Sequence, residues 1–176
     1  MQDGRFIIRV IKEETINAHA YPDGNIRIYS GLMDYMDDDE LTFFIGHEMG
    51  HVVHQHILKQ YKHDMQVEAV KKIVEASSKD TIIRNIGRKV FEKYLNRAYS
   101  RSEEYEADIY GLYFVVKNGY MPESAARALD KLVELNKGER ACLVERMFST
   151  HPESEARAKR IRKNAKLQEM LCTIKH

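Results

Sequence analysis

The sequence predicts an α+β fold in which a small N-terminal antiparallel sheet precedes a mostly helical body. Runs of apolar and β-branched residues, separated by turn-forming residues, fill the first 30 positions and are typical of short strands. Beyond Gly31 the apolar residues recur at helical spacing instead. The 176 residues can bury a substantial core, and no repeat, low-complexity tract or linker divides them. We therefore expect one domain that spans residues 1–176.

Three strands are expected near the N-terminus. Residues 6–11 form a continuous apolar and β-branched run, and residues 17–21 fit a second, shorter strand. Residues 22–25 read Pro-Asp-Gly-Asn, which is strong turn chemistry. Residues 26–29 then alternate between apolar and polar side chains, as a half-buried strand does. We expect the sheet to end at Gly31.

A long helix is expected to begin near residue 38. The acidic run at residues 37–40 favours a helix start, because carboxylates cap N–H groups and stabilise the positive end of the helix dipole. The apolar residues that follow would cover nearly all sides of this helix: they are Leu41, Phe43, Phe44, Ile45, Val52, Val53, Ile57 and Leu58. A helix that is apolar all round is typically buried, so we expect His47 and His51 within it to be buried too.

The overall composition excludes several classes of partner. With 28 basic and 27 acidic residues the formal net charge is +1, which gives no argument for binding nucleic acid or an anionic membrane. The longest apolar stretch, at residues 109–116, is far too short to span a bilayer, and no signal peptide pattern opens the chain. Cys142 and Cys172 are isolated, so they do not indicate a disulfide framework. We expect no nucleic-acid partner and no transmembrane segment in this chain.

Residues 47–51 read His-Glu-Met-Gly-His, which is the core pattern of a catalytic zinc site. Residues four apart lie one turn apart on the same face of a helix, so both imidazoles can reach one zinc ion at about 2.1 Å. Glu48 lies beside them and can take a proton from a zinc-activated water, and Gly50 allows another backbone to come close. The alternative is two histidines on a partly exposed face, but unpaired polar side chains in a buried helix would be costly. We therefore expect His47 and His51 to bind zinc.

A catalytic zinc ion usually has a third protein ligand. The metzincin pattern would place glycine at position 54 and histidine at position 57, but the chain has His54 and Ile57. A downstream glutamate is the other common solution, and residues 100–108 read Ser-Arg-Ser-Glu-Glu-Tyr-Glu-Ala-Asp. Spacing alone leaves the choice among three glutamates open: Glu103, Glu104 and Glu106.

The acidic segment also has the pattern of a helix start. Ser100 and Glu103 match a capping box, and Glu104 and Asp108 would then share one helix face. Glu104 could bind zinc there while Asp108 orients a histidine ligand, and the alternative is a solvated acidic face. His63 is a further candidate for the third ligand, provided that the helix carrying the histidines ends and folds back.

Five separate segments resemble one known family. They are Asn-Ala-His-Ala at 17–20, Gly-Leu-Met at 31–33, Gly-His-Glu-Met-Gly-His at 46–51, the acidic segment at 100–108, and Thr-His-Pro at 150–152 with Arg157. In this order, over residues 6–165, they resemble the gluzincin-type zinc endopeptidases that include HtpX, the CAAX prenyl proteases and the periplasmic protease BepA. The resemblance implies a gluzincin-like fold with the sheet flanking a zinc cleft.

The resemblance also implies the ligands and their neighbours. It assigns one zinc ion per chain to His47, His51 and Glu104. Asp108 would support these ligands from behind, and Arg157 corresponds to an arginine that pairs with acidic residues near the zinc. The alternative for Arg157 is a solvated position within a basic helix face.

Asn17 and Ala18 match a segment that binds extended peptide in this family. An edge strand offers unpaired N–H and C=O groups, to which a substrate can add as the next strand. Taken alone, Asn17 could equally begin a turn. His19 stands where the family usually has an aromatic residue, which bears on substrate preference. His56 stands where relatives often have histidine, and we expect it to form a structural hydrogen bond.

Thr150-His151-Pro152 has the pattern of a helix start, since proline fits the first helical turn. A simple cap is the alternative, but Ser, Thr, Asp or Asn would cap the helix better than His151 does. We expect His151 either to stabilise the reaction oxyanion or to occupy the fourth position on zinc and hold the enzyme latent.

Together these assignments predict a zinc-dependent endopeptidase that cleaves unfolded or extended protein chains. Zinc would lower the pKa of a bound water toward about 7, and Glu48 would take its proton and pass it to the leaving amine. The alternative is a catalytically silent, chaperone-like zinc-binding module of the same fold, against which an intact Glu48 argues. A structural zinc site is disfavoured because such sites usually contain cysteines, and none lies near these motifs.

Two further expectations come from the resemblance alone. Relatives carry additional residues before the first strand, so the chain is either an excised catalytic domain or a naturally minimal member. Relatives also act in protein quality control, and they favour a location in the bacterial cell envelope, either periplasmic or attached to the membrane.

Overall fold

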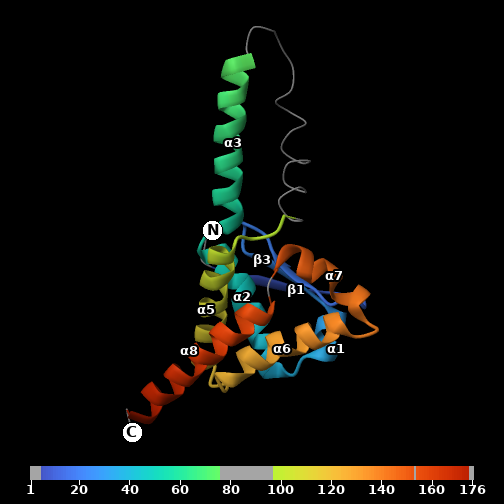
Figure 1. The fold of residues 1–176 in the computed structure, drawn as a ribbon, viewed down its shortest axis with the longest axis vertical. Helices are drawn as coiled ribbons and strands as arrows, with labels where there is room; N and C mark the ends of the chain where they lie inside the picture. Colours follow the sequence, from blue (N-terminus) through green and yellow to red (C-terminus); the bar gives the residue numbers. More distant parts are fainter. Residues whose placement is uncertain (1–4, 76–96, 153, 175–176) are drawn as a thin grey trace.

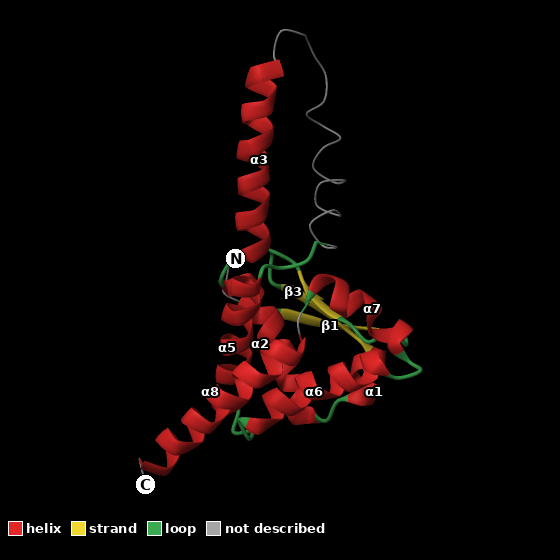
Figure 2. Cartoon of the chain, in the orientation of Figure 1, coloured by secondary structure: helices red, strands yellow, loops and turns green. Residues whose placement is uncertain are grey.

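The computed structural model describes residues 5–75, 97–152 and 154–174, and it confirms the α+β architecture. A three-stranded sheet lies beside a body of helices (Figures 1 and 2). Two long helices, α3 (His56–Glu75) and α8 (Ser154–Ile174), extend away from this body in Figure 1. None of the helices in these ranges combines the length and apolarity needed to cross a bilayer.

The sheet is mixed, so the expected antiparallel sheet is wrong for its first strand. β1 (Ile7–Ile11) pairs in parallel with β3 (Asn25–Tyr29), whereas β2 (Ala18–Ala20) pairs antiparallel with β3, in the order β1-β3-β2. The chain reverses direction twice between β1 and β3, so these two strands run the same way. Because β3 inserts between the other two, its partner β1 is parallel. Alternation of apolar residues identifies a strand but does not specify which neighbour it takes.

The expected turn residues form the β2–β3 hairpin. Gly24 has a φ of 90°, which lies in the left-handed region that glycine adopts without a steric cost. The Asn25 N–H donates to Oδ1 of Asp23 at 3.0 Å, and the Tyr21 N–H donates to the Asn25 carbonyl oxygen at 2.7 Å. Within the described ranges, β2 pairs only with β3 and forms an edge of the sheet.

A short helix, α1 (Ser30–Tyr35), joins the sheet to α2 (Asp38–Val53). The acidic start of α2 is a capping box. Oδ1 of Asp37 accepts the Glu40 N–H at 2.9 Å, and Oε2 of Glu40 accepts the Asp37 N–H at 3.0 Å. The residues expected to begin this helix therefore do so.

The helix ends earlier than its apolar pattern predicted. Gln55 has a φ of 56°, which interrupts the helix after Val53, and α3 begins at His56. The expected single helix through Ile57 and Leu58 is therefore wrong. No glycine or proline marks this break, so the pattern gave no indication of it.

The helix α5 (Arg101–Lys117) packs closely along α2, because glycines remove side chains from the interface. A Cβ on Gly46 would lie 2.6 Å from Cβ of Phe114, and one on Gly50 would lie 2.9 Å from Cα of Ala107. Both distances are shorter than real contacts, so larger residues would force the helices apart. The backbone expected to approach Gly50 is that of α5, and this approach brings the acidic segment beside the histidines of α2.

The remaining helices complete the core around α2. They are α6 (Glu123–Lys137) and α7 (Ala141–Thr150), followed by α8. α6 packs against both α2 and α8, as Figure 1 also shows for α6 and α8. Phe43, Phe44, Leu129, Leu132 and Ile161 are among the fully buried side chains of this core. The connection between α7 and α8 carries residue 151 back to the centre of the molecule.

Candidate metal centre

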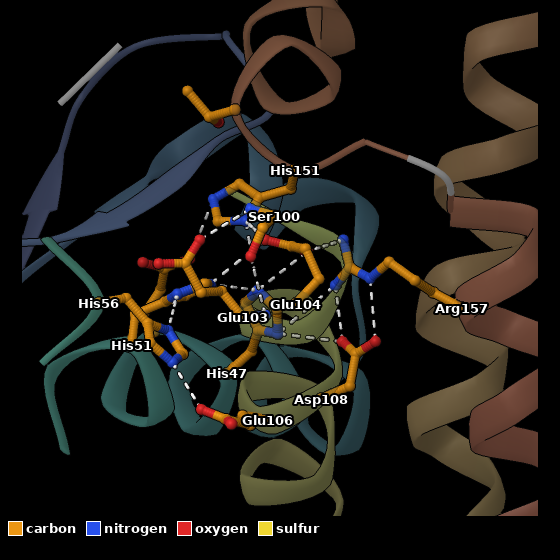
Figure 3. Close-up of polar contacts among 12 residues, drawn as sticks. His47, His51, His56, Ser100, Glu103, Glu104, Glu106, Asp108, His151 and Arg157 are labelled. Carbon is orange, nitrogen blue, oxygen red and sulfur yellow. Dashed lines mark hydrogen bonds and ion pairs between the residues drawn. The ribbon is translucent and has the colours of Figure 1, made fainter. Parts of the chain in front are cut away.

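Four buried side chains point toward one another at the centre of the molecule (Figure 3). His47 and His51 come from α2, Glu104 from the first turn of α5, and His151 from the connection between α7 and α8. Each side chain is at most 3% exposed. Segments far apart in the sequence therefore bring three histidines and one carboxylate to a single point.

The nitrogen and oxygen atoms of this group have the spacing of a metal site. Nε2 of His47 lies 3.0 Å from Nε2 of His51 and 3.3 Å from Nδ1 of His151. Oε1 of Glu104 lies 3.4 Å from Nε2 of His51 and 2.8 Å from Nδ1 of His151. Ligands bound tetrahedrally to zinc at about 2.05 Å would lie about 3.3 Å apart. These distances, from 2.8 to 3.4 Å, match the separation of neighbouring ligands on one metal ion, and His151 supplies the fourth atom of the group.

Glu48 lies beside this group and is 1% exposed. Its Oε1 is 3.5 Å from Nε2 of His151. Among the residues that the structure describes, neither oxygen of Glu48 accepts a hydrogen bond. An ionised carboxylate without hydrogen bonds is costly to bury, so this position is typical of a functional group rather than a structural one.

Asp108 and Arg157 lie behind the central group and contact two of its members. Oδ1 of Asp108 lies 3.1 Å from Nδ1 of His47, which leaves Nε2 of this ring to face the centre. Arg157 donates two hydrogen bonds to Asp108, at 2.9 Å from Nε and 2.7 Å from Nη2. Nη1 of the same arginine lies 2.5 Å from Oε2 of Glu104. Both residues occupy the positions that the family resemblance implied, as Figure 3 shows.

The ionisable side chains of this group shift one another's pKa values. Burial disfavours ionisation of Glu104 and Asp108, but the Arg157 guanidinium and the neighbouring histidines together outweigh it and lower the pKa of each carboxyl. Burial alone would lower the pKa of Arg157, but Asp108 and Glu104 raise it above its ordinary value. Burial lowers the pKa of His51 well below its usual range, so this ring is neutral and has a free lone pair. A neutral imidazole and an ionised carboxylate are the forms that bind a metal.

A second chain of hydrogen bonds supports His51 from the other side. Nδ1 of His51 lies 2.8 Å from Nδ1 of His56, and Nε2 of His56 lies 3.0 Å from Oε2 of Glu106 (Figure 3). When His51 binds a metal through Nε2, its Nδ1 carries a proton and donates it to His56. His56 then holds its own proton on Nε2 and donates it to Glu106. His56 thus forms the hydrogen bond that we expected of it.

This tautomer order bears on a second group with ligand spacing, which consists of His54, His56 and Glu106. Nδ1 of His54 lies 3.8 Å from Oε2 of Glu106. In the order described above, however, Nδ1 of His56 accepts a hydrogen bond from His51, and Nε2 of His56 donates one to Glu106. No ring nitrogen of His56 is then free to bind a metal, so we interpret the group as an outer part of the hydrogen-bond chain.

The other candidate third ligands lie away from the centre. Glu103 forms the expected capping box, in which its Oε2 accepts the Ser100 N–H at 2.8 Å. His63 is exposed on α3 and does not belong to the central group. Although the helix does end after the motif, the α3 helix that follows extends away from the body of the molecule (Figure 1). Of the three glutamates, the structure brings only Glu104 to the two histidines of α2.

Tyr99 holds one side of the site. Its ring stacks on that of His51, with a centroid distance of 3.7 Å and an interplanar angle of 23°. The Tyr99 N–H donates to the carbonyl oxygen of Thr150 at 2.9 Å, which fixes the backbone next to His151. Aromatic residues at such positions more often belong to a core, so the local pattern does not predict this contact.

The segment proposed to bind substrate lies at the edge of the sheet beside the site. Asn17 directly precedes β2, and Ala18 is its first residue. Asn17 is 3% exposed, and within the described residues its Oδ1 has no hydrogen-bond partner. Together with His151 and Tyr99 it borders a cavity next to the central group. This position fits an edge strand rather than the start of a turn.

The fold and the central group define a class of protein. Two imidazoles and a carboxylate form a donor set that suits zinc, and their atoms lie close enough together to share one ion. A buried glutamate beside such a group is the arrangement of a metallohydrolase.

Comparison with known proteins identifies the family. The model of peptidase family M48 matches residues 1–165, so the chain belongs to this family of metallopeptidases, as the sequence resemblance implied. The chain is 36% identical over 158 residues to metalloprotease LoiP of Escherichia coli, and 33% identical over 156 residues to metalloprotease YcaL of the same organism. Each match covers 88% of this chain and 60% of the relative. The chain is also 27% identical to the mitochondrial metalloendopeptidase OMA1 of Arabidopsis thaliana, over 93% of this chain and 32% of the relative. The chain thus spans about three fifths of the LoiP and YcaL sequences.

Proposed function

We propose that this chain is a zinc-dependent endopeptidase that cleaves extended or unfolded protein chains. The observation that carries the proposal is the buried Glu48 beside four convergent metal-binding atoms. A site that only bound a metal would have no use for a buried carboxylate without hydrogen bonds. We assign His47, His51 and Glu104 as the ligands of one zinc ion per chain.

The side chains of this site have distinct roles in the reaction. Zinc, when bound, supplies the Lewis acid that activates water and polarises the scissile carbonyl. Glu48 accepts the proton of the attacking water and passes it to the leaving amine. Asp108 keeps the proton of His47 on Nδ1, at 3.1 Å, and Arg157 keeps Asp108 and Glu104 ionised.

His151 is proposed to act in two positions. In the structure its Nδ1 lies within 3.3 Å of both His47 and Glu104, which supports a resting state in which it would be a fourth ligand of the metal. Its Nε2 faces Glu48 at 3.5 Å. When substrate occupies the cleft, a shift of the Thr150–Pro152 connection would turn His151 toward the oxyanion, which it would stabilise by donating a hydrogen bond.

The free edge of β2 supports the choice of substrate. An extended peptide can pair with this edge and continue the sheet beside the site, whereas a folded domain cannot present its backbone in this way. The buried Oδ1 of Asn17 would accept an N–H of the bound chain.

The proposal is tested with zinc-loaded protein and two substrates, unfolded casein and a rigid native domain. We expect casein to be cut and the native domain to be spared until it is denatured, and a chelator to stop both reactions. In the variant Asn17→Ala we expect a higher KM with unchanged zinc content. Equal cleavage of the native and denatured forms would contradict strand addition, and no cleavage of either would contradict the proposed activity.

A further inference from the structure

A basic cavity lies between the edge of the sheet and the proposed zinc site. It has a volume of about 180 Å³ and is bordered on one side by His151 and Thr150. The opposite side comes from the β2–β3 hairpin, with His19 on β2 and Arg27 on β3, and Arg146 of α7 completes it. A substrate strand paired with β2 would therefore place a side chain next to this cavity.

The cavity carries two positive charges and no negative one. Arg27 and Arg146 both line it, and none of its lining residues is an aspartate or glutamate. Burial and then the positive charges of Arg146 and Arg27 lower the pKa of His19 to about 4. Both guanidinium groups therefore act on the same ring, which is neutral at physiological pH, so His19 adds no charge to that of the arginines.

Both arginines are oriented by cation–π contacts rather than by carboxylates. Arg27 lies over the ring of Tyr21, with Cζ 4.6 Å from the centroid, and Arg146 lies over Tyr29 at 5.9 Å. Among the residues that the structure describes, neither guanidinium is in an ion pair with a carboxylate. Elsewhere in the chain the arginines near acidic side chains form ion pairs, as Arg127 does with Asp37 and Glu40. The two arginines of the cavity are thus oriented, accessible and uncompensated.

We propose that this cavity is a specificity pocket that binds a carboxylate side chain of the substrate next to the scissile bond. This inference rests on the proposed peptidase function and names its substrate preference. A guanidinium binds a carboxylate through charge-assisted hydrogen bonds, and two of them can share one aspartate or glutamate. The neutral ring of His19, with Nε2 3.1 Å from the hydroxyl of Tyr21, forms the polar wall between them.

The test uses peptides that differ at one position beside a mapped cleavage site, with Glu, Gln or Lys there. We expect kcat/KM to be about 10-fold higher for the Glu peptide than for the Gln peptide, which is the scale of hydrogen bonds to charged groups in a partly open site. The charge reversal Arg146→Glu leaves one positive and one negative charge in the cavity, so it should abolish the preference for the Glu peptide. Arg140→Glu is the matched control, because Arg140 precedes the same helix and lies over the ring of Tyr35 but lines a different cavity.

Binding separates failure of the pocket from failure of the enzyme. The zinc-loaded Glu48→Gln variant should bind the fluorescent Glu peptide about 10-fold more tightly than the Gln peptide, whether or not the wild-type protein cuts either. Equal affinities would overturn the pocket assignment, whereas selective binding without wild-type cleavage would overturn only the proposed function. A carboxylate could also come from the C-terminus of a peptide. A Gln peptide that ends at the varied position with a free α-carboxylate distinguishes this source from a carboxylate side chain. Tighter binding of that peptide than of the Glu peptide would overturn the assignment to a side chain.

Discussion

Replacing Arg157 by methionine tests the network behind the ligands most severely. The guanidinium is 2% exposed and contacts Asp108 twice and Glu104 once. Methionine keeps much of the side-chain volume but leaves two buried carboxylates without their cation. Removing one partner of a buried ion pair costs about 3–5 kcal/mol. For a chain of this size, each kcal/mol shifts Tm by about 2–4 °C, so we expect Tm to fall by about 6–20 °C.

The loss of stability in Arg157→Met should depend on whether zinc is bound. Zinc would neutralise part of the negative charge on Glu104, so Arg157→Met should lose less stability when zinc-loaded than with a chelator. Urea denaturation and calorimetry of both forms measure this difference. Arg127→Met is the matched control: Arg127 also contacts two carboxylates, those of Asp37 and Glu40, but its side chain is 48% exposed and Lys131 still pairs with Glu40. The control should lose about 1 kcal/mol or less. Equal losses in the two variants would refute the reasoning.

Five further substitutions test the ligands and their support. His47→Ala and Glu104→Ala should each lose zinc in metal analysis, whereas Glu103→Ala should retain it, because that side chain caps a helix; retention in Glu104→Ala would contradict the ligand assignment. His56→Ala should weaken zinc binding about 10–100-fold in competition with a chelator, the usual effect of removing a ligand's hydrogen-bond partner, and unchanged affinity would show that this chain does not orient its ligand. His151→Ala should lower kcat about 10²–10³-fold and reduce the protein ligands of resting zinc from four to three in X-ray absorption spectra. A rise in kcat would contradict the catalytic role of His151, and an unchanged ligand number would contradict its resting position.

Local patterns made much of the fold and half of the site predictable. The strands were visible as apolar, β-branched or alternating runs, and the helix starts were visible as an acidic cap at residues 37–40 and a capping box at residues 100–103. His47 and His51 were readable because one helical turn alone places them on the same face. Features that depend on contacts between distant segments could not be predicted in this way. The position of β3 between β1 and β2 depends on packing, and the left-handed Gln55 that ends α2 has no typical turn residue to announce it.

The choice of Glu104 shows where sequence reasoning reached its limit. It lies beyond α3 and more than 50 positions from His51, and only the close packing at Gly46 and Gly50 brings α5 to the histidines. The spacing alone left three glutamates open, and the family resemblance was needed to select one. A capping role for Glu103 was already visible in its pattern with Ser100. The contact of Glu106 with His56, by contrast, joins two helices, and no local pattern encodes it.

The central claim is that Glu48 is the general base of a zinc peptidase, and Glu48→Gln tests it most directly. Glutamine keeps the size of the side chain but cannot accept the proton. Zinc content and the cleavage rate of unfolded casein should be measured on the same samples of wild-type and variant protein. We expect equal zinc content and a rate at least about 10²–10⁴-fold lower in the variant. Near-normal cleavage by the zinc-loaded variant would contradict the account.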